Sequence, residues 1–240
     1  MTTSQAITGS TAQAIDTRRD FLATSVTGLL LIGCAAESGK AARTAGAANE
    51  KKEAEVTPGE DLMQEHGLIE RILLIYDEGA RRITQNEPLD LETIAGAARI
   101  VRRFVEDYHE KQEEQFVFPR LQRAGREEAL VAILLRQHQR GRELTEEIVR
   151  RASSSASPEL AQSLRSFSRM YRPHAAREDT VLFPAFRAVV GADGYQELGE
   201  RFEENEHTIF GEHGFENTVA QVAQLESALG IDDLAQFTAR

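Results

Sequence analysis

The chain is poor in several residue types, and each scarcity narrows what the protein can be. Its 240 residues include a single cysteine, so this chain alone forms no intramolecular disulfide and no cysteine-based zinc or iron–sulfur site. Tryptophan is absent and aromatic residues make up only 6%. Basic residues number 28 against 39 acidic ones, a formal net charge of −11, which argues against nucleic-acid binding through a basic face. Any bound metal must therefore be held by histidines and carboxylates.

The apolar stretch near the N-terminus, about residues 23–32, is too short to span a bilayer as a helix but suits a signal peptide. Arg18 and Arg19, followed by Asp-Phe-Leu, resemble a twin-arginine export signal. The run Leu-Ile-Gly-Cys34 resembles a lipobox, whose cysteine is lipidated. The simpler alternatives are a chance arginine pair and a buried cysteine. The resemblances imply a signal peptide over 1–33 and export across a bacterial inner membrane. The protein would then face the periplasm, held to a membrane by a lipid on Cys34.

Residues 34–57 hold almost no large apolar side chains and are expected to form a flexible tether. From residue 58 onward, apolar residues recur at helical spacing, which predicts an all-α fold. We expect helices from Pro58 to the Asn-Glu-Pro break at 86–88, and over about 89–121, 126–151 and 158–190. Short connections make neighbouring helices antiparallel, so residues 58–190 are predicted to form an up-down-up-down four-helix bundle.

Several features close the bundle or interrupt it. The Thr57-Pro58-Gly59-Glu60 segment is predicted to cap the first helix. Pro173 is expected to kink or unwind the fourth helix. The Gly191–Gly194 segment should end the bundle. Residues 191–240 are then expected to form a C-terminal helical extension across its outside, with a helix near 195–228 and a short segment near 231–237.

One motif occurs twice with identical spacing. His109-x3-Glu113-Glu114-x3-Phe-Pro is repeated as His174-x3-Glu178-Asp179-x3-Phe-Pro. Residues four apart lie on one face of a helix, so each copy directs an imidazole and a carboxylate to one place. Two such helices facing each other supply two nitrogens and two carboxylates that can bridge, which is the ligand chemistry of a transition-metal pair, iron in particular.

The apolar stripes of the first and third helices carry His66 and His138 in the same way. Taken singly, each is more simply a hydrogen-bonded core histidine. Taken together, six buried polar groups without a common partner would consume most of a domain's stability of about 5–15 kcal/mol, and a metal supplies that partner. The candidate ligands are His66, His109, Glu113, His138, His174 and Glu178.

Three neighbours of the candidate ligands each have two alternative roles. Glu114 and Asp179 are expected to support ligands or lie on a helix surface, with Asp179 the alternative to Glu178 as a ligand. Tyr171 is either a hydrogen-bond donor near the site or a core aromatic. His207 and His213 lie among acidic residues and are expected to be solvated.

With these residues identified, the chain from about 58 to 190 resembles the hemerythrin-like (HHE cation-binding) family. The resemblance implies a non-haem centre of two iron ions in a four-helix bundle, held by the six candidate ligands. Manganese and zinc also suit such ligands. Oxygen-carrying hemerythrins have His-x3-His on the third helix, whereas here Leu134 and Arg142 flank His138 at that spacing. One imidazole fewer implies a more open, solvent-accessible iron pair and argues against oxygen transport.

Three functions follow from this interpretation. The first is a di-iron protein of the cell envelope, more a binder than an enzyme, which binds or senses oxygen or nitric oxide. The second is a di-iron oxidoreductase of the peroxidase, oxidase or nitric oxide reductase type, with Tyr171 or Glu114 as a proton source. The third is an iron sensor or storage module. The sequence names no protein partner and no oligomeric state.

Overall fold

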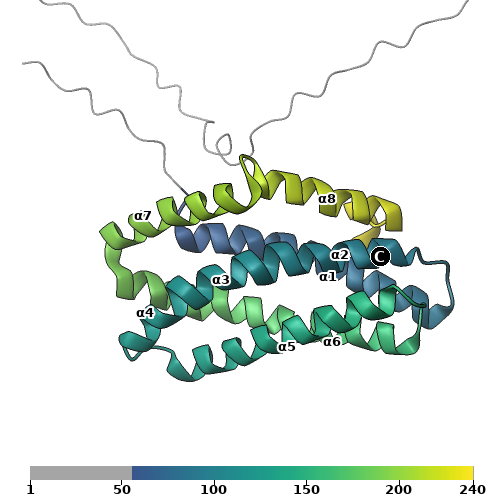
Figure 1. Cartoon of the computed structure of the whole chain (residues 1–240), viewed down its shortest axis with the longest axis horizontal. Coiled ribbons are helices and arrows are strands. Elements are labelled where there is room, and N and C mark those ends of the chain that lie inside the picture. The colour runs from purple at the N-terminus through teal and green to yellow at the C-terminus, as the bar shows by residue number, and fades with distance from the viewer. Residues whose placement is uncertain (1–55, 240) are drawn as a thin grey trace, which may run out of the picture. The chain divides into compact units, whose positions relative to one another are not determined.

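The computed structural model describes residues 56–239, and all regular structure in this range is helical (Figure 1). The elements are α1 (Pro58–Gln85), α2 (Leu91–Ile100), η2 (Val101–His109), α3 (Glu110–Gln112), η3 (Glu113–Val117), α4 (Phe118–Arg123), α5 (Glu128–Ala152), α6 (Pro158–Arg177), η4 (Glu178–Leu182), α7 (Phe183–Phe210), α8 (Gly214–Leu229) and η5 (Leu234–Phe237). Of these, η2, η3 and η4 are π-helical and η5 is a 3₁₀ turn. Within the described range no helix is both long and apolar enough to cross a membrane.

Helix α1 begins and ends where its sequence predicts. The Thr57 side chain accepts a hydrogen bond from the Glu60 amide, and the Glu60 carboxylate accepts one from the Thr57 amide at 3.1 Å. Pro58 occupies the first helical position, where its missing N–H costs nothing. Asn86 ends the helix in the left-handed conformation, φ 53°. The predicted cap and the predicted break are both confirmed.

The repeated motif produces a repeated backbone irregularity. The amide of Phe118 donates to the carbonyl of Glu113, and the amide of Phe183 donates to that of Glu178, so each bond reaches back five residues instead of four. The following residue is proline in both cases, and a proline ring crowds the carbonyl four residues before it. A widened turn relieves this contact, and such turns often occur at functional sites. Both motif glutamates therefore begin a π-helical turn.

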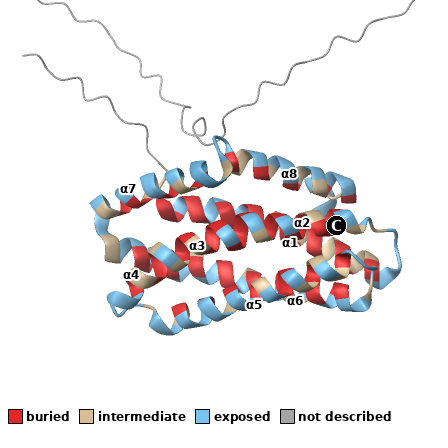
Figure 2. Ribbon diagram, viewed as in Figure 1, coloured by how far each residue is buried: buried red, intermediate tan, exposed pale blue. Residues whose placement is uncertain are grey.

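The long helices pack side by side as a bundle, with α1 against α6, α6 against α5, and α5 against α2 (Figure 1). Buried side chains line the inward faces of all of them (Figure 2). The apolar core has two parts. One contains Ile72, Tyr76, Phe104, Leu164 and Phe167, among others. The second contains Leu62, Phe118, Leu121, Leu134 and Phe186, among others. The candidate ligands come from the stretches of helix between these two parts.

The chain turns at Gly191, whose φ of 74° and ψ of 173° are accessible to glycine and strained for other residues. Beyond this bend α7 continues to Phe210, and α8 follows it, so the extension contains two helices where one was expected. The Tyr195 hydroxyl accepts a hydrogen bond from the Gly59 amide at 3.0 Å, and Arg71 binds Glu226 of α8. The extension thus packs on the start and the middle of α1.

Of the kink or unwinding expected at Pro173, the unwinding does not occur. Helix α6 remains α-helical through Pro173 as far as Arg177, so the chain does not unwind beside His174. The irregular turn begins at Glu178 instead, five residues after the proline. The Phe-Pro pair that follows this turn explains its position better than Pro173 does.

Candidate metal centre

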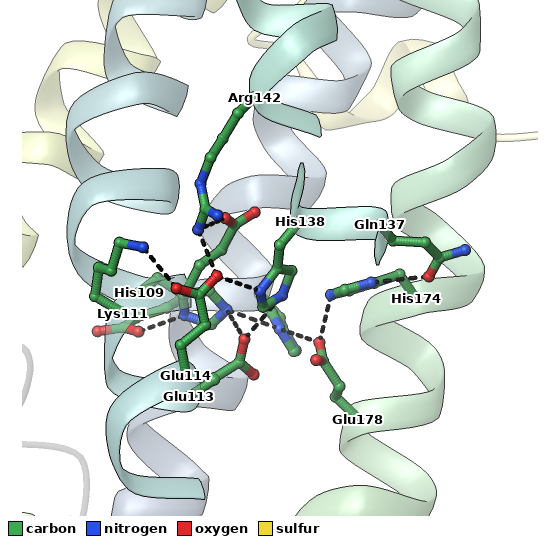
Figure 3. A network of polar contacts seen from close by, with 12 residues as sticks. His109, Lys111, Glu113, Glu114, Gln137, His138, Arg142, His174 and Glu178 are labelled. Carbon is green, nitrogen blue, oxygen red and sulfur yellow. Dashed lines mark hydrogen bonds and ion pairs between the residues drawn. The ribbon is translucent and has the colours of Figure 1, made fainter. Parts of the chain in front are cut away.

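The six candidate ligands lie on four separate stretches of helix. Figure 3 shows His109, Glu113, His138, His174 and Glu178 side by side in the bundle, and His66 lies against His109 and Glu178. All six are almost completely enclosed, with exposed fractions between 0% and 3%. This overturns the expectation of a solvent-accessible site, because the neighbouring side chains close it even though the third helix supplies one histidine. Their positions are His66 on α1, His109 at the end of η2, Glu113 at the start of η3, His138 on α5, His174 on α6 and Glu178 at the start of η4.

The four imidazoles form two pairs. The Nε2 atoms of His66 and His109 are 3.1 Å apart. The rings of His138 and His174 lie beside each other with centroids 5.0 Å apart. Two nitrogens that bind one ion at about 2.1 Å and at right angles to each other are about 3 Å apart, so the first pair already has the separation that a shared ion requires. We call these the His66–His109 position and the His138–His174 position.

The two glutamates connect the pairs. Glu178 Oε2 lies 3.0 Å from His174 Nε2 and 3.4 Å from His66 Nε2. Glu113 Oε2 lies 3.4 Å from His138 Nε2 and 3.9 Å from His109 Nε2. Each carboxylate therefore faces one histidine of either pair, as a ligand shared between two ions must. Asp179, the alternative to Glu178, is placed differently and contacts His66 from behind.

Several side-chain oxygens and nitrogens of the candidate ligands are buried without a hydrogen bond. Within residues 56–239, neither the oxygens of Glu113 and Glu178 nor the Nε2 atoms of His138 and His174 have a partner in hydrogen-bonding geometry, although Glu178 Oε2 lies at ion-pair distance from His174 Nε2. Burying polar groups without such hydrogen bonds costs several kcal/mol. Suitable donor atoms also fall into two groups whose members lie within 4.8 Å of one another, one with Glu113, His138, His174 and Glu178, and the other with His66, His109 and Glu113. The residues present fit a pair of metal ions.

Each histidine is held from behind by a partner on a different helix. His66 Nδ1 donates to Asp179 at 2.7 Å, and His138 Nδ1 donates to Glu114 at 3.1 Å. These bonds turn the Nε2 atoms inward and fix the tautomer, as outer partners of metal-binding histidines commonly do. Asp179 and Glu114 are therefore supports for histidines, which was one of the two roles expected of them.

The remaining two histidines have partners that sequence reasoning missed. His109 Nδ1 donates to Glu65 at 2.7 Å, and His174 Nδ1 donates to Gln137 at 3.0 Å. Each of these partners directly precedes a candidate ligand in the sequence, since Glu65 comes before His66 and Gln137 before His138. Nothing in the spacing reveals this role, which depends on how neighbouring helices are rotated against each other.

Protons compete with a metal for the histidine nitrogens, and His66 and His138 differ in their affinity for a proton. Burial opposes protonation of His66, but contact with Asp179 and Glu178 outweighs it and raises the pKa of His66 to about 9 in the metal-free protein. For His138, burial dominates over the contact with Glu114 and lowers the pKa to about 4. A proton thus occupies the His66–His109 position at neutral pH when no metal does, and binding a metal must displace it.

The two glutamates differ in the same metal-free state. Burial and repulsion from Glu178 raise the pKa of Glu113 well above its ordinary value. Burial acts on Glu178 in the same sense, but attraction to His174 and His66 prevails, and the pKa of Glu178 is lowered. Glu113 therefore holds its proton to higher pH than Glu178 does, as expected when two carboxyl groups share a confined space.

The other residues singled out in the sequence fall around this centre or far from it. The Tyr171 ring lies 5.0 Å from the His174 ring, centroid to centroid, and within residues 56–239 its buried hydroxyl makes no hydrogen bond. His207 and His213 are exposed, as expected. Arg142, where a second histidine would sit in oxygen carriers, binds Glu110 and Glu114, both at 2.6 Å. Arg18, Arg19 and Cys34 lie outside the described residues.

Comparison with known proteins agrees with this geometry. A family model described as the hemerythrin HHE cation binding domain matches residues 57–186. Similar proteins include the uncharacterized protein Rv1995 of Mycobacterium tuberculosis and the uncharacterized protein Mb2018 of Mycobacterium bovis. Each is 46% identical over 194 residues, which span 78% of this chain and 76% of the relative. No solved structure matches the chain significantly.

Proposed function

This chain belongs to the hemerythrin HHE cation-binding family, and we propose that it is a non-haem di-iron protein of the cell envelope that binds or senses oxygen or nitric oxide. The proposal takes the bundle to be the antiparallel up-down-up-down arrangement expected from the sequence. The family match and the two groups of donor atoms already identify a helical protein whose buried histidines and glutamates suit metal cations.

One observation carries the proposal: two histidine pairs face two glutamates that lie between them, all six groups buried. His66 and His109 would hold one ion, His138 and His174 the second, and Glu113 and Glu178 both. Such iron pairs bind diatomic molecules and change oxidation state. The residues around them orient the imidazoles through Nδ1, exclude bulk water and supply the negative charge that balances the cations.

The burial of the site supports a small ligand. None of the six candidate metal-binding residues is more than 3% exposed, so a large substrate cannot reach the centre without rearrangement of the bundle. A diatomic molecule requires far less room. This favours binding of oxygen or nitric oxide over oxidation of a bulky organic substrate.

A di-iron oxidoreductase is the second candidate, and Tyr171 favours it. Its phenol is buried beside His174, and no residue of the described chain accepts its proton, so the hydroxyl can donate to a molecule at the centre. Peroxide or nitric oxide turnover by the iron-loaded protein, with a large loss in Tyr171→Phe, would favour this candidate over simple binding. An iron sensor or store remains the third.

The envelope location rests on the sequence alone, through Arg18 and Arg19, the apolar stretch of about residues 23–32, and Cys34. It is tested in the parent bacterium by fractionation of cells that carry the full chain or Cys34→Ala. The proposal predicts that the parent protein is found with membranes, and that the variant is released into the soluble envelope fraction. A parent protein in the cytoplasm would contradict it.

The test of the proposed function is metal analysis combined with absorption spectroscopy. The full chain, isolated from iron-supplemented cells, should contain about two irons. It should show charge-transfer bands in air that disappear on reduction and return on exposure to oxygen. Return without decay over repeated cycles indicates ligand binding, and progressive decay with product formation indicates catalysis. Zinc or no metal in the isolated protein, with unchanged helicity after chelation, would contradict a di-iron function.

A further inference from the structure

The partners of the four histidine Nδ1 atoms form a closed circuit around the bundle. The first helix orients the histidine of the second through Glu65, and the second orients that of the third through Glu114. The third helix orients the histidine of the fourth through Gln137, and the fourth orients that of the first through Asp179. Every partner adjoins a candidate ligand in the sequence. Each helix thus places one ligand and steadies the histidine of a neighbour.

This circuit has near-twofold symmetry with one clear exception. Asp179 behind His66 corresponds to Glu114 behind His138, and both are carboxylates. Glu65 behind His109 corresponds to Gln137 behind His174, which is a carboxylate against a neutral amide. The candidate ligands themselves show no such difference, since each position has two histidines and shares two glutamates.

Acidic side chains lie near the partners on both sides. Carboxyl oxygens of Asp61, Glu65 and Glu206 lie within 4.8 Å of one another, and Glu110 and Glu114 form a similar group with His138. Glu65 is 1% exposed, so its charge lies inside the protein. The difference between the two metal positions therefore rests on the partners themselves, Glu65 and Gln137.

The consequence for a bound ion follows from electrostatics. A carboxylate that accepts the Nδ1 proton makes the imidazole a stronger donor at Nε2, and an amide does so far less. Charges buried in the protein interior also act on each other more strongly than in water. Both effects stabilise higher positive charge at the His66–His109 position.

We infer that Glu65 and Gln137 make the two metal positions unequal, so that the His66–His109 position holds the more highly charged ion. If two ferric ions were bound here, a one-electron donor would reduce the ion held by His138 and His174 first, and the donor would be oxidised by one electron. This inference rests on the proposed function, and it concerns how the chain distributes charge between the two positions.

The test is redox titration of the iron-loaded full chain with dithionite and small mediators, followed by absorption and electron paramagnetic resonance. Three isosteric variants are compared with the parent: Glu65→Gln, Gln137→Glu and the double exchange. Glu92→Gln, which removes an equally charged but exposed carboxylate that binds Arg99, controls for net charge. Glutamine still accepts the Nδ1 proton, so the exchange alters charge and leaves the hydrogen bond in place.

The parent should be reduced in two one-electron steps, with a half-reduced form that accumulates. Glu65→Gln should raise the lower potential and leave the upper one nearly unchanged. Gln137→Glu should lower the upper potential and leave the lower one nearly unchanged. Changes in the partners of metal-binding histidines alter metal affinity about 10–100-fold, and a change of this size confined to the ferric ion corresponds to about 59–118 mV for one electron. The double exchange should reverse which position is reduced first.

Three results would overturn the inference. The first is two steps in which Glu65→Gln moves the upper potential. The second is an equal response of both steps to each variant and to Glu92→Gln. The third is a single step in the parent that no variant splits. In all three cases iron is bound and the proposed function stands. A chain that takes up no iron would instead refute the proposed function, and the inference with it.

Discussion

Each half of the metal centre contains one copy of the repeated motif, and the two halves differ in the residues that hydrogen-bond to their histidines. The half with His66 and His109 is supported by two carboxylates, Asp179 and Glu65. The half with His138 and His174 is supported by one cation-paired carboxylate, Glu114, and one amide, Gln137. A repeat can therefore reproduce the ligands of a site twice while the residues beside them make its two positions chemically different.

The same comparison shows what the halves share. Glu113 and Glu178 each lie between one histidine of either pair, so neither half is complete without the motif of its counterpart. The histidines belong to one position each and the glutamates belong to both. Substitutions of the two kinds should have different consequences, which the following predictions use.

Loss of a shared glutamate should have the largest effect. In Glu178→Ala both positions lose a ligand, and His66 and His174 lose the carboxylate that faces them. We expect the metal content to fall from about two ions per chain toward zero, measured by elemental analysis after gel filtration. Asp179→Ala is the matched control beside it in the sequence, and it should retain metal with lower affinity. Two tightly held ions in Glu178→Ala would contradict the sharing.

Loss of one histidine should remove the ion at its own position and leave the second ion bound. In His174→Ala we expect about one ion per chain to remain, at the His66–His109 position, because His174 belongs to a single pair. Elemental analysis gives the number, and calorimetric titration of the metal-free protein should show one binding step instead of two. Loss of both ions from this variant would show that the positions fill only together.

Removal of the metal should lower stability by an amount that mass action sets. A ligand at a thousand times its dissociation constant stabilises the folded state by about 4 kcal/mol. For a domain of this size that is a shift in melting temperature of about 8–16 °C. Thermal unfolding followed by circular dichroism, before and after chelation, measures it. An unchanged melting temperature would mean that the six buried groups are satisfied without a metal.

In the metal-free protein His66 and His138 should make stability respond to pH in opposite directions. The raised pKa of His66, about 9, stabilises the folded state fully below pH 6.5, and this contribution is lost as pH rises from 6.5 through 9. The lowered pKa of His138, about 4, makes stability fall as pH drops from 6.5 toward 4. Each effect is of order 1–3 kcal/mol.

Urea unfolding of the metal-free protein between pH 4 and 9 gives the free energy of unfolding as a function of pH, with an acid limb below pH 6.5 and an alkaline limb above it. Asp179→Asn should flatten the alkaline limb, because it removes the acceptor of the His66 proton, and should leave the acid limb unchanged. An alkaline limb of parent size in this variant would show that His66 is not its source.

Much of this centre could be predicted from the sequence, because four-residue spacing on a helix holds wherever the helix packs. The repeat alone places His109 with Glu113 and His174 with Glu178, and the apolar stripes add His66 and His138. The pairing of His66 with His109 depends on distances between helices, which spacing does not contain. The same holds for Glu65 and Gln137, whose role appears only once neighbouring helices are rotated into register.

Two expectations failed for physical reasons. The site was expected to be open because the third helix has one histidine, yet the surrounding side chains close it, and Arg142 extends to Glu110 and Glu114 instead of leaving a gap. Unwinding was expected at Pro173, whereas the π-helical turns occur before Phe-Pro in both copies of the motif.

The most direct test of the central claim is anomalous diffraction at the iron edge from crystals of the iron-loaded protein. The account predicts two peaks about 3.5–4 Å apart, one beside His66 and His109 and the second beside His138 and His174, with Glu113 and Glu178 contacting both. A single peak, or two peaks that do not share these glutamates, would contradict it.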